Sequence, residues 1–217
     1  MKKISRSDFL KISGLSFGGI LMLPHHSCSG ISNKKLTING ANNYQIVIPA
    51  NASKIEEEAS LQLKKHLSLL SKQAPNVVKE NEYNGKNGIF IGQTNNAKKN
   101  NVAADALEED GYVFKNIGDD FLIQGGSEKG LIFGIYSLLE SFGFRKYAAD
   151  DPLDIPSTIN FELPNNITKI PKINYRTTNY YEGRDSEYAD WNKLSSRDSW
   201  GLFCSHFRSS CSARKIW

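Results

Sequence analysis

The stretch that decides the fold is "SEKGLIFGIYSLLESFG", Ser127 to Gly143. Apolar residues surround it on nearly all sides, which predicts a helix that is buried rather than lying on a surface. Ser127 is a preferred N-terminal cap residue, and Gly143 suits the left-handed conformation that commonly ends a helix. We therefore expect a buried helix between these two residues.

The segment before this helix is typical of a β-hairpin. In "GYVFKNIGDDFLIQGG", Gly111 to Gly126, two alternating runs flank Gly118-Asp119, and glycine at the first turn position suits the type II′ geometry that matches strand twist. The loop at 125–130 could bind an anion on free backbone N–H groups. It lacks the Gly-Lys-Ser/Thr ending of a phosphate-binding loop, so we interpret it as a turn and a cap.

A second, amphipathic helix is expected earlier in the chain. Ser53 and Glu56 have the spacing of a capping box, in which hydroxyl and carboxylate each satisfy a free backbone N–H. His66 borders the apolar stripe and is predicted to be packed or solvated rather than a ligand. The stripe itself consists of residues at helical spacing, namely Ile55, Ala59, Leu63, Leu67 and Leu70.

Short apolar runs predict the strands that these helices cover. They are "YQIVIP" (44–49), "NVVKE" (76–80), "GIFIGQT" (88–94) and "STINFELP" (157–164). Strands, two main helices and a hairpin predict an α+β fold, a two-layer α/β sandwich with a mixed sheet, over residues 44–165. The stretch from Pro164 to Pro171 is interpreted as a linker into a further segment.

The residues at 130–145 carry a family resemblance. "GLIFGIYSLLESFGFR" matches the pattern G-x-x-x-G-[IV]-Y-x-L-L-E-x-x-G-[FV]-R, and the sequence resembles the N-terminal accessory domain of bacterial α-glucuronidases and β-N-acetylhexosaminidases. The order of elements over about residues 40–165 agrees with that domain. In those glycoside hydrolases the domain precedes a (β/α)8 barrel, which cleaves glycosidic bonds with a pair of carboxylic acids.

Residues 171–203 resemble the opening of such a barrel: a strand, a loop, a helix and a second strand from Trp200. A whole barrel takes about 250 residues, and far fewer follow Ile170. We therefore expect a non-catalytic part of a glycoside hydrolase, inactive by itself, with residues 171–217 poorly packed. The alternative is a surface lipoprotein that binds glycans without cleaving them.

One candidate substrate-binding residue follows from the resemblance. Arg176 resembles the hexosaminidase arginine that binds sugar hydroxyls, although Thr177 stands where a glycine usually follows; the alternative is a salt-bridged residue. The histidines at 25, 26, 66 and 206 do not form an H-E-x-x-H zinc motif, and residues 40–165 show no paired carboxylates at a catalytic spacing. No catalytic residue, metal site or cofactor is therefore predicted. Aromatic residues that could stack on sugars cluster nearby, namely Tyr175, Tyr180, Tyr181, Tyr188, Trp191 and Trp200.

The N-terminus has the pattern of an export signal over residues 1–27. A charged start precedes the apolar run at 12–23, which is too short to span a membrane. Cys28 resembles the lipid-modified cysteine of bacterial lipoproteins, which would anchor the protein to a membrane; simple cleavage or a free thiol are the alternatives. We expect a periplasmic or outer-membrane location in a Gram-negative bacterium, with residues 28–43 as a linker.

The charge distribution argues against a nucleic-acid partner. The total is +4, but residues 1–27 and 208–217 each carry a net +3, so the region between them carries a net −2. Nucleic-acid binders keep positive charge on the folded part. The expected partner is carbohydrate, bound through the missing catalytic domain.

The tail 204–217 contains Cys204, His206 and Cys211. Removing one base at the codon of Cys204 gives, for one codon choice, the reading VHTFEALVPPEKY, which resembles the continuation of the family. The hypothesis is a frameshift after Phe203. A metal site and a Cys204–Cys211 disulfide are the alternatives, although the paired spacing of structural zinc sites is absent.

Overall fold

The computed structural model describes residues 35–37, 44–70, 74–157, 160–173, 175–178 and 181–195. Its centre is a six-stranded sheet with the strand order β3-β2-β4-β6-β5-β8. The strands are β2 (Gln45–Ile48), β3 (Asn76–Lys79), β4 (Gly88–Ile91), β5 (Tyr112–Ile117), β6 (Asp120–Gly125) and β8 (Ile167–Lys169).

The sheet is mixed, as predicted. Strand β2 runs parallel to β3 and β4, and β4 runs parallel to β6. The hairpin strand β5 is antiparallel to both β6 and β8. Gly118 takes φ +58° in the hairpin turn, where glycine carries no steric penalty.

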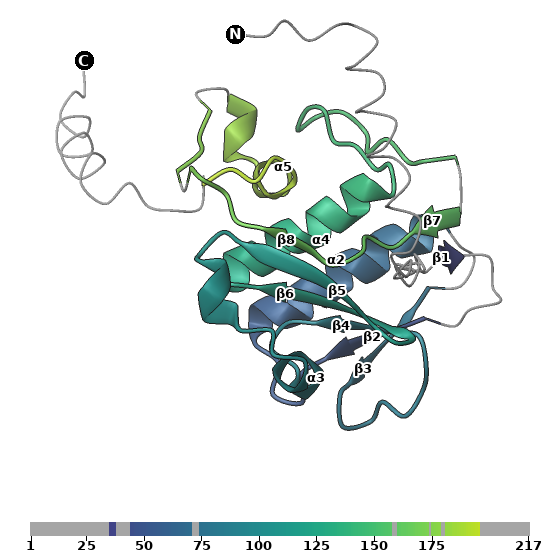
Figure 1. Ribbon diagram of the computed structural model, residues 1–217. Helices are drawn as coiled ribbons and strands as arrows, with labels where there is room; N and C mark the ends of the chain where they lie inside the picture. The colour runs from purple at the N-terminus through teal and green to yellow at the C-terminus, as the bar shows by residue number, and fades with distance from the viewer. Residues whose placement is uncertain are drawn as a thin grey trace, which may run out of the picture. The chain divides into compact units, whose positions relative to one another are not determined.

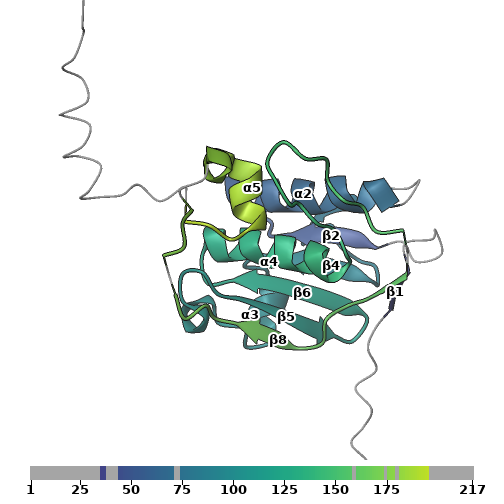
Figure 2. The ribbon, with the colours of Figure 1, turned by 90° about the horizontal axis from the view of Figure 1, so that it is seen from above.

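Two long helices, α2 (Lys54–Leu70) and α4 (Glu128–Ser141), lie side by side on one face of the sheet (Figures 1 and 2). The short helix α3 (Asn95–Lys99) lies on the opposite face, followed by the 3-10 turn η1 (Ala104–Leu107). The predicted α+β two-layer sandwich with two main helices is therefore confirmed.

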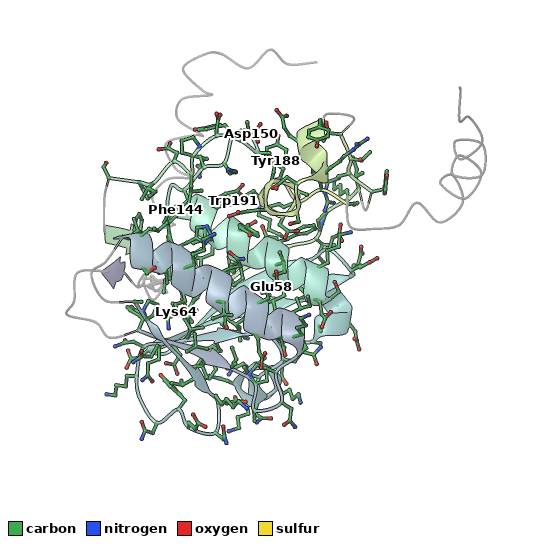
Figure 3. The ribbon with its side chains drawn as sticks, turned by 180° about the vertical axis from the view of Figure 1, so that it is seen from behind. Glu58, Lys64, Phe144, Asp150, Tyr188 and Trp191 are labelled. Carbon is green, nitrogen blue, oxygen red and sulfur yellow. The ribbon has the colours of Figure 1, made fainter. Side chains whose placement is uncertain are left out.

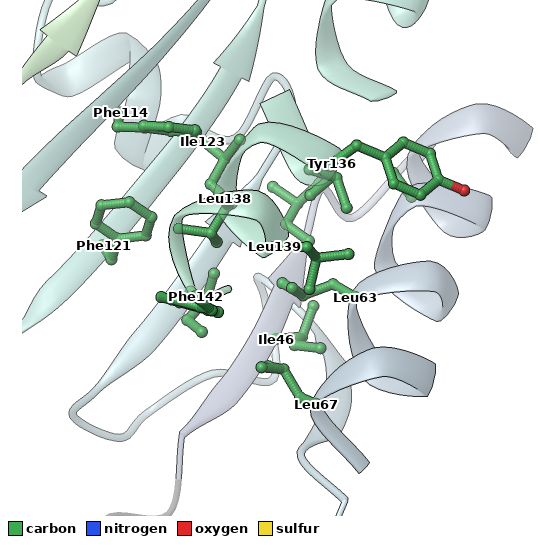
Figure 4. Packing of buried hydrophobic residues seen from close by; sticks show 14 of the residues in the cluster. Ile46, Leu63, Leu67, Phe114, Phe121, Ile123, Tyr136, Leu138, Leu139 and Phe142 are labelled. Atoms are coloured by element: carbon green, nitrogen blue, oxygen red, sulfur yellow. The ribbon is translucent and has the colours of Figure 1, made fainter. Parts of the chain in front are cut away.

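The central strands are buried on both faces, because both faces are covered. Ile46, Ile89 and Ile123 are fully buried on the side of α2 and α4, where Figure 4 shows Ile46 beside Leu63 and Leu67 of α2. The side chains that alternate with them pack with α3 in a smaller cluster of Val47, Phe90, Ala97 and Leu122.

The helix ends follow the local predictions. The N–H of Ser53 donates to Glu56 Oε2 at 2.9 Å, and the N–H of Glu56 donates to Ser53 Oγ at 3.2 Å. Ser127 Oγ accepts from the first-turn N–H groups of α4. Gly143 has φ +99°, so both caps of α4 lie where the sequence predicted them.

Two short strands lie within stretches that were predicted to be linkers. The expected linker 28–43 contains β1 (Lys35–Thr37), which pairs with β7 (Asn160–Glu162) in a separate two-stranded sheet. The sixth strand of the main sheet is β8, inside the stretch expected to be a linker. The hairpin strand β5 offers it an open edge of unpaired backbone groups, which a neighbouring segment can satisfy.

The segment at 171–195 also departs from expectation. No strand is found in 171–173 or 175–178; the turn η2 (Tyr181–Arg184) and the helix α5 (Ser186–Trp191) follow. The predicted helix is present. The predicted poor packing does not hold for α5, since Trp191 is 2% exposed, and for residues 196–217 it lies outside the described residues. The backbone carbonyl of Arg176 accepts from the N–H of Ser195, whereas the N–H of Arg176 donates to the side-chain Oγ of Ser195 at 3.2 Å, which is not the backbone pairing of a β-ladder.

Several predictions fall on residues that the structure does not describe. They are the export signal at 1–27, Cys28, the second barrel strand from Trp200 and the tail at 204–217. Among the helices of the described ranges, none is both long and apolar enough to cross a membrane.

Candidate functional site

Arg176 is held against the sandwich by protein groups. Its Nη2 donates to Asp110 Oδ2 at 2.7 Å, its Nε donates to the carbonyl of Lys193 at 2.8 Å, and its Nη1 donates to the carbonyl of Ile173. The guanidinium also lies 5.5 Å from the ring centroid of Phe133, within the range of a cation–π contact. This arrangement is that of an anchoring residue.

Asp110 is the partner that makes this anchor. Its side chain is 3% exposed and lies between two cations, Arg176 at 2.7 Å and Lys129 Nζ at 3.1 Å. Burial of a carboxylate to this depth is costly unless the group is paired. We call the contact between residues 171–195 and the sandwich the joint.

The joint continues through an aromatic cluster on the outer side of α2 and α4. Trp191 of α5 lies 4.8 Å from Tyr136 and 5.6 Å from His66, measured between ring centroids. Phe144 completes the cluster, at 5.8 Å from His66. Figure 3 shows Phe144 and Trp191 above the two long helices, with Tyr188 on the same α5.

His66 lies at the centre of this cluster and is fully buried. Its Nδ1 is 2.7 Å from the carbonyl of Gln62, while Nε2 has no hydrogen-bond partner among the described residues. Burial lowers the pKa of His66 from its ordinary value, against a smaller opposing effect of the Gln62 carbonyl. As predicted, this histidine is a packed residue.

A groove of about 660 Å³ lies at the carboxyl ends of the parallel strands. The segments that form it are the loops at 49–53 and 92–95 and the stretch at 124–128. They follow β2, β4 and β6 and lead into α2, α3 and α4. We call this feature the strand-end groove.

Two carboxylates of the strand-end groove are engaged by backbone N–H groups. Glu56 accepts from Ser53 through Oε2 and from Gln93 through Oε1, the latter at 2.8 Å. Glu80 accepts from Asn95 and Asn96, both at 2.8 Å. Each carboxylate therefore occupies the position at a helix N-terminus that an anion would take.

The conformation at 92 depends on this arrangement. Gly92 has φ +81°, and a Cβ atom placed on it would lie 2.1 Å from Glu56 Oε1. Glycine is therefore required both by the backbone angle and by the close approach of the carboxylate.

A comparison with family models identifies the protein family of this chain. The model described as "Glycosyl hydrolase family 67 N-terminus" matches residues 29–138, which is half of the chain. The chain belongs to this family. The match confirms the resemblance to an N-terminal accessory domain of glycoside hydrolases.

Solved structures of other glycoside hydrolases are similar to this family member. One is an inactive mutant of a family 20 exo-β-N-acetylglucosaminidase from Vibrio harveyi, with 16% identity, a TM-score of 0.40, and coverage of 66% of this chain and 17% of that chain. Another is a β-N-acetylhexosaminidase from Bacteroides fragilis, with 14% identity, a TM-score of 0.40, and coverage of 67% and 23%. No curated protein matches. The chain spans less than a quarter of the length of these two enzymes.

Among the described residues of this family member, the aromatic side chains predicted to stack on sugars differ in exposure. Trp191 is buried in the joint, whereas Tyr175 and Tyr181 are 45% and 81% exposed. Tyr180 and Trp200 lie outside the described residues. Arg176 borders a hollow of about 400 Å³ beside Tyr112 and Phe133, and its binding of sugar hydroxyls stays a prediction.

The strand-end groove is what sequence reasoning missed. The Ser53–Glu56 pair was predicted as a helix cap, but its contact with Gln93 joins residues 37 positions apart. Part of the sequence signal for this groove was present, because polar residues follow two of the predicted strands, within 50–53 and 92–95. Within the described part of the chain, no group of three or more His, Cys, Asp or Glu side chains is placed to hold a metal ion.

Proposed function

We propose that this chain is the N-terminal, non-catalytic part of an exported glycoside hydrolase that degrades carbohydrate, α-glucuronidase-like or hexosaminidase-like. The observation that carries the proposal is the family match over residues 29–138. The chemistry belongs to a (β/α)8 barrel that follows the sandwich in sequence. The joint supports this order, because it holds the segment after the sandwich in a defined position.

The carboxylates of the sandwich support a non-catalytic role. A general acid must carry a proton that it can deliver, and a nucleophile needs a free oxygen. All four carboxylate oxygens of Glu56 and Glu80 accept backbone N–H groups instead. Each of these oxygens therefore already has a bonded donor.

Hydrolysis assays test this proposal. The purified 217-residue chain is incubated with nitrophenyl α-glucuronide and nitrophenyl β-N-acetylglucosaminide, and the release of nitrophenol is measured. We expect no turnover above buffer. Turnover by the chain alone, surviving repurification and lost on heat denaturation, would contradict the proposal.

Sequencing of the gene tests the hypothesis of a frameshift after Phe203. A displaced base at the codon of Cys204, followed by a barrel-coding frame, is the expected result. A protein expressed from the restored frame should then hydrolyse one of the two nitrophenyl glycosides. An unchanged in-frame read at Cys204 removes the frameshift from the proposal.

Export and lipidation are tested together in a Gram-negative host. We expect the protein in the membrane fraction, labelled by radioactive palmitate, with the label lost in Cys28→Ser. Cys204→Ser is the matched control and should keep the label. A protein that stays in the cytoplasm would contradict export, and an exported protein without label would favour simple cleavage at the signal.

A further inference from the structure

The strand-end groove lies where the strand order of the sheet reverses. From β2 the chain passes through α2 to β3 on one side, and β4 then lies on the other side of β2. Helix α2 covers one face of the sheet and α3 the other. In open α/β sheets, ligands bind outside the carboxyl ends of the strands at such a reversal. The groove is lined by the residues that follow β2 and β4.

Gln124, near the end of β6, also lines this groove and has an unsatisfied polar atom. Its side chain is 2% exposed, and its Nε2 donates to the carbonyl of Gly125 at 2.9 Å. Its carboxamide oxygen is buried and has no hydrogen-bond partner among the described residues. A buried acceptor without a donor is costly. The three residues 125–127 separate it from α4, a helix of 14 residues.

The charges of the groove favour an uncharged ligand. The carboxylates of Glu56 and Glu80 are already balanced by the N-terminal N–H groups of α2 and α3, so an anionic ligand would find these positions taken. The remaining charged side chains that line the groove are Lys98 and Glu128, of opposite sign. These two side chains therefore add no net charge to the groove.

We propose that the strand-end groove binds a neutral sugar, with a ligand hydroxyl donating to Gln124 Oε1. The exposed side-chain amides of Asn51 and Gln93 offer further donors and acceptors for sugar hydroxyls. The volume, about 660 Å³, lies within the range of small-molecule sites. The choice of a sugar among neutral polar compounds rests on the proposed function.

Titration of the full ¹⁵N-labelled chain tests the groove. D-glucose, D-xylose and N-acetyl-D-glucosamine are the neutral probes; D-glucuronate, which shares the glucose ring but carries a carboxylate, and inorganic phosphate are the anionic ones. At least one neutral sugar should shift the backbone amide signals of Gln93 and Gly125 saturably. D-glucuronate should bind about tenfold more weakly than glucose, because its carboxylate would have to be desolvated beside the carboxylates of Glu56 and Glu80.

Two glutamines provide a matched pair of variants. Gln124→Leu keeps the size of the side chain but removes the acceptor, and should weaken sugar binding about tenfold or more without loss of folding. Gln62→Leu is the control, since its carboxamide oxygen is likewise buried and without a partner among the described residues, but it does not line the groove. It should bind as the unmodified chain does. Gln93→Ala, at an exposed position of the rim, replaces Gln124→Leu as the test if that variant fails to fold.

Three results would overturn the inference. The first is the absence of saturable shifts with any neutral sugar up to high millimolar concentration. The second is unchanged affinity in a folded Gln124→Leu. The third is tighter binding of phosphate or glucuronate than of the neutral sugars. Each leaves the hydrolase proposal standing, because that proposal is tested by turnover on nitrophenyl glycosides. Conversely, if the protein expressed from the restored frame hydrolyses neither glycoside, the proposal of sugar binding in the strand-end groove still stands.

Discussion

The joint and the strand-end groove each contain a nearly buried carboxylate, but the two are held differently. Asp110 lies between the side-chain cations of Lys129 and Arg176, of which Arg176 is 66 positions away. Glu56 accepts from backbone N–H groups at helix and loop ends. The joint therefore ties a later segment to the sandwich through side chains, whereas the groove wall completes the backbone hydrogen bonding of the sandwich itself.

This difference indicates where stability resides in each region. Pairing of buried charges is offset by the cost of removing them from water, so the ion pairs of the joint define its geometry more than they stabilise it. The apolar burial of Trp191 is the larger contribution, because transfer of a large aromatic surface from water is favourable by itself. In the strand-end groove, the hydrogen bonds of Glu56 stabilise the fold as helix caps do.

The largest effect is expected from Trp191→Ala. Removal of this side chain from the cluster of His66 and Tyr136 leaves a large cavity and should lower the free energy of unfolding by about 3–5 kcal/mol. Denaturant unfolding followed by fluorescence measures it, with Tyr181→Ala, which is 81% exposed, as the control with little change. A loss below about 1 kcal/mol would show that α5 does not belong to the cooperative core.

Asp110→Asn should have the next largest effect. The substitution leaves Lys129 and Arg176 half-buried without their counter-charge and should cost about 2–3 kcal/mol. It should also release the segment after residue 170, which limited proteolysis with mass spectrometry detects as cleavage within 171–195. Asp105→Asn, at an exposed position, is the control. Protection equal to that of the unmodified chain would show that apolar contacts alone hold the joint.

Glu56→Gln tests the groove wall and should cost about 1 kcal/mol. The neutral amide is a weaker acceptor for the N–H groups of Ser53 and Gln93, and it loses the favourable interaction with the N-terminus of α2. Glu57→Gln is a matched control, since Glu57 is exposed in the same first turn. Equal thermal unfolding temperatures for the two variants would contradict the assigned role of Glu56.

The smallest effect is a dependence of stability on pH through His66. Burial lowers the pKa of His66 in the folded state below the ordinary 6.5, so the unfolded chain binds a proton more readily. Stability is then unaffected by this group above pH 6.5 and falls as the pH drops below it, until the folded-state pKa is reached. The charges of Lys65 and Glu187 act on this pKa in opposite directions.

Denaturant unfolding between pH 5 and 7.5 measures this slope. His66→Phe, which keeps an aromatic ring in the cluster without a titrating group, should flatten the part of the slope that centres on pH 6.5. An identical slope in the variant would assign the pH dependence to other groups.

The comparison also separates what was predictable from what was not. The capping box at Ser53 and Glu56 and the glycine at Gly143 were predictable because their partners lie within a few residues. The bond from Gln93 to Glu56 was not, since nothing local specifies which loop will meet that carboxylate. The same holds for Asp110 and Arg176, whose pairing requires the joint to be formed.

Strand β8 illustrates the same limit in the fold. Its residues, Ile167–Lys169, are few and only partly apolar, and nothing in their local pattern distinguishes them from a connection. They become a strand because β5 presents an open edge at that point. Conversely, the first barrel strand was expected within residues 171–178, and the described residues 171–173 and 175–178 form no strand.

By itself, the sequence determined the elements whose patterns are periodic and whose caps are local, namely the two long helices, the hairpin and the central strands. It also determined the family, because the motif at 130–145 is one contiguous stretch, which forms part of the buried helix α4 and the loop after it. Only the tertiary structure decided which carboxylate meets which donor, and so created the joint and the strand-end groove. The physical reason is that hydrogen bonds and ion pairs act over a few ångströms, and the fold alone brings residues distant in sequence within that range.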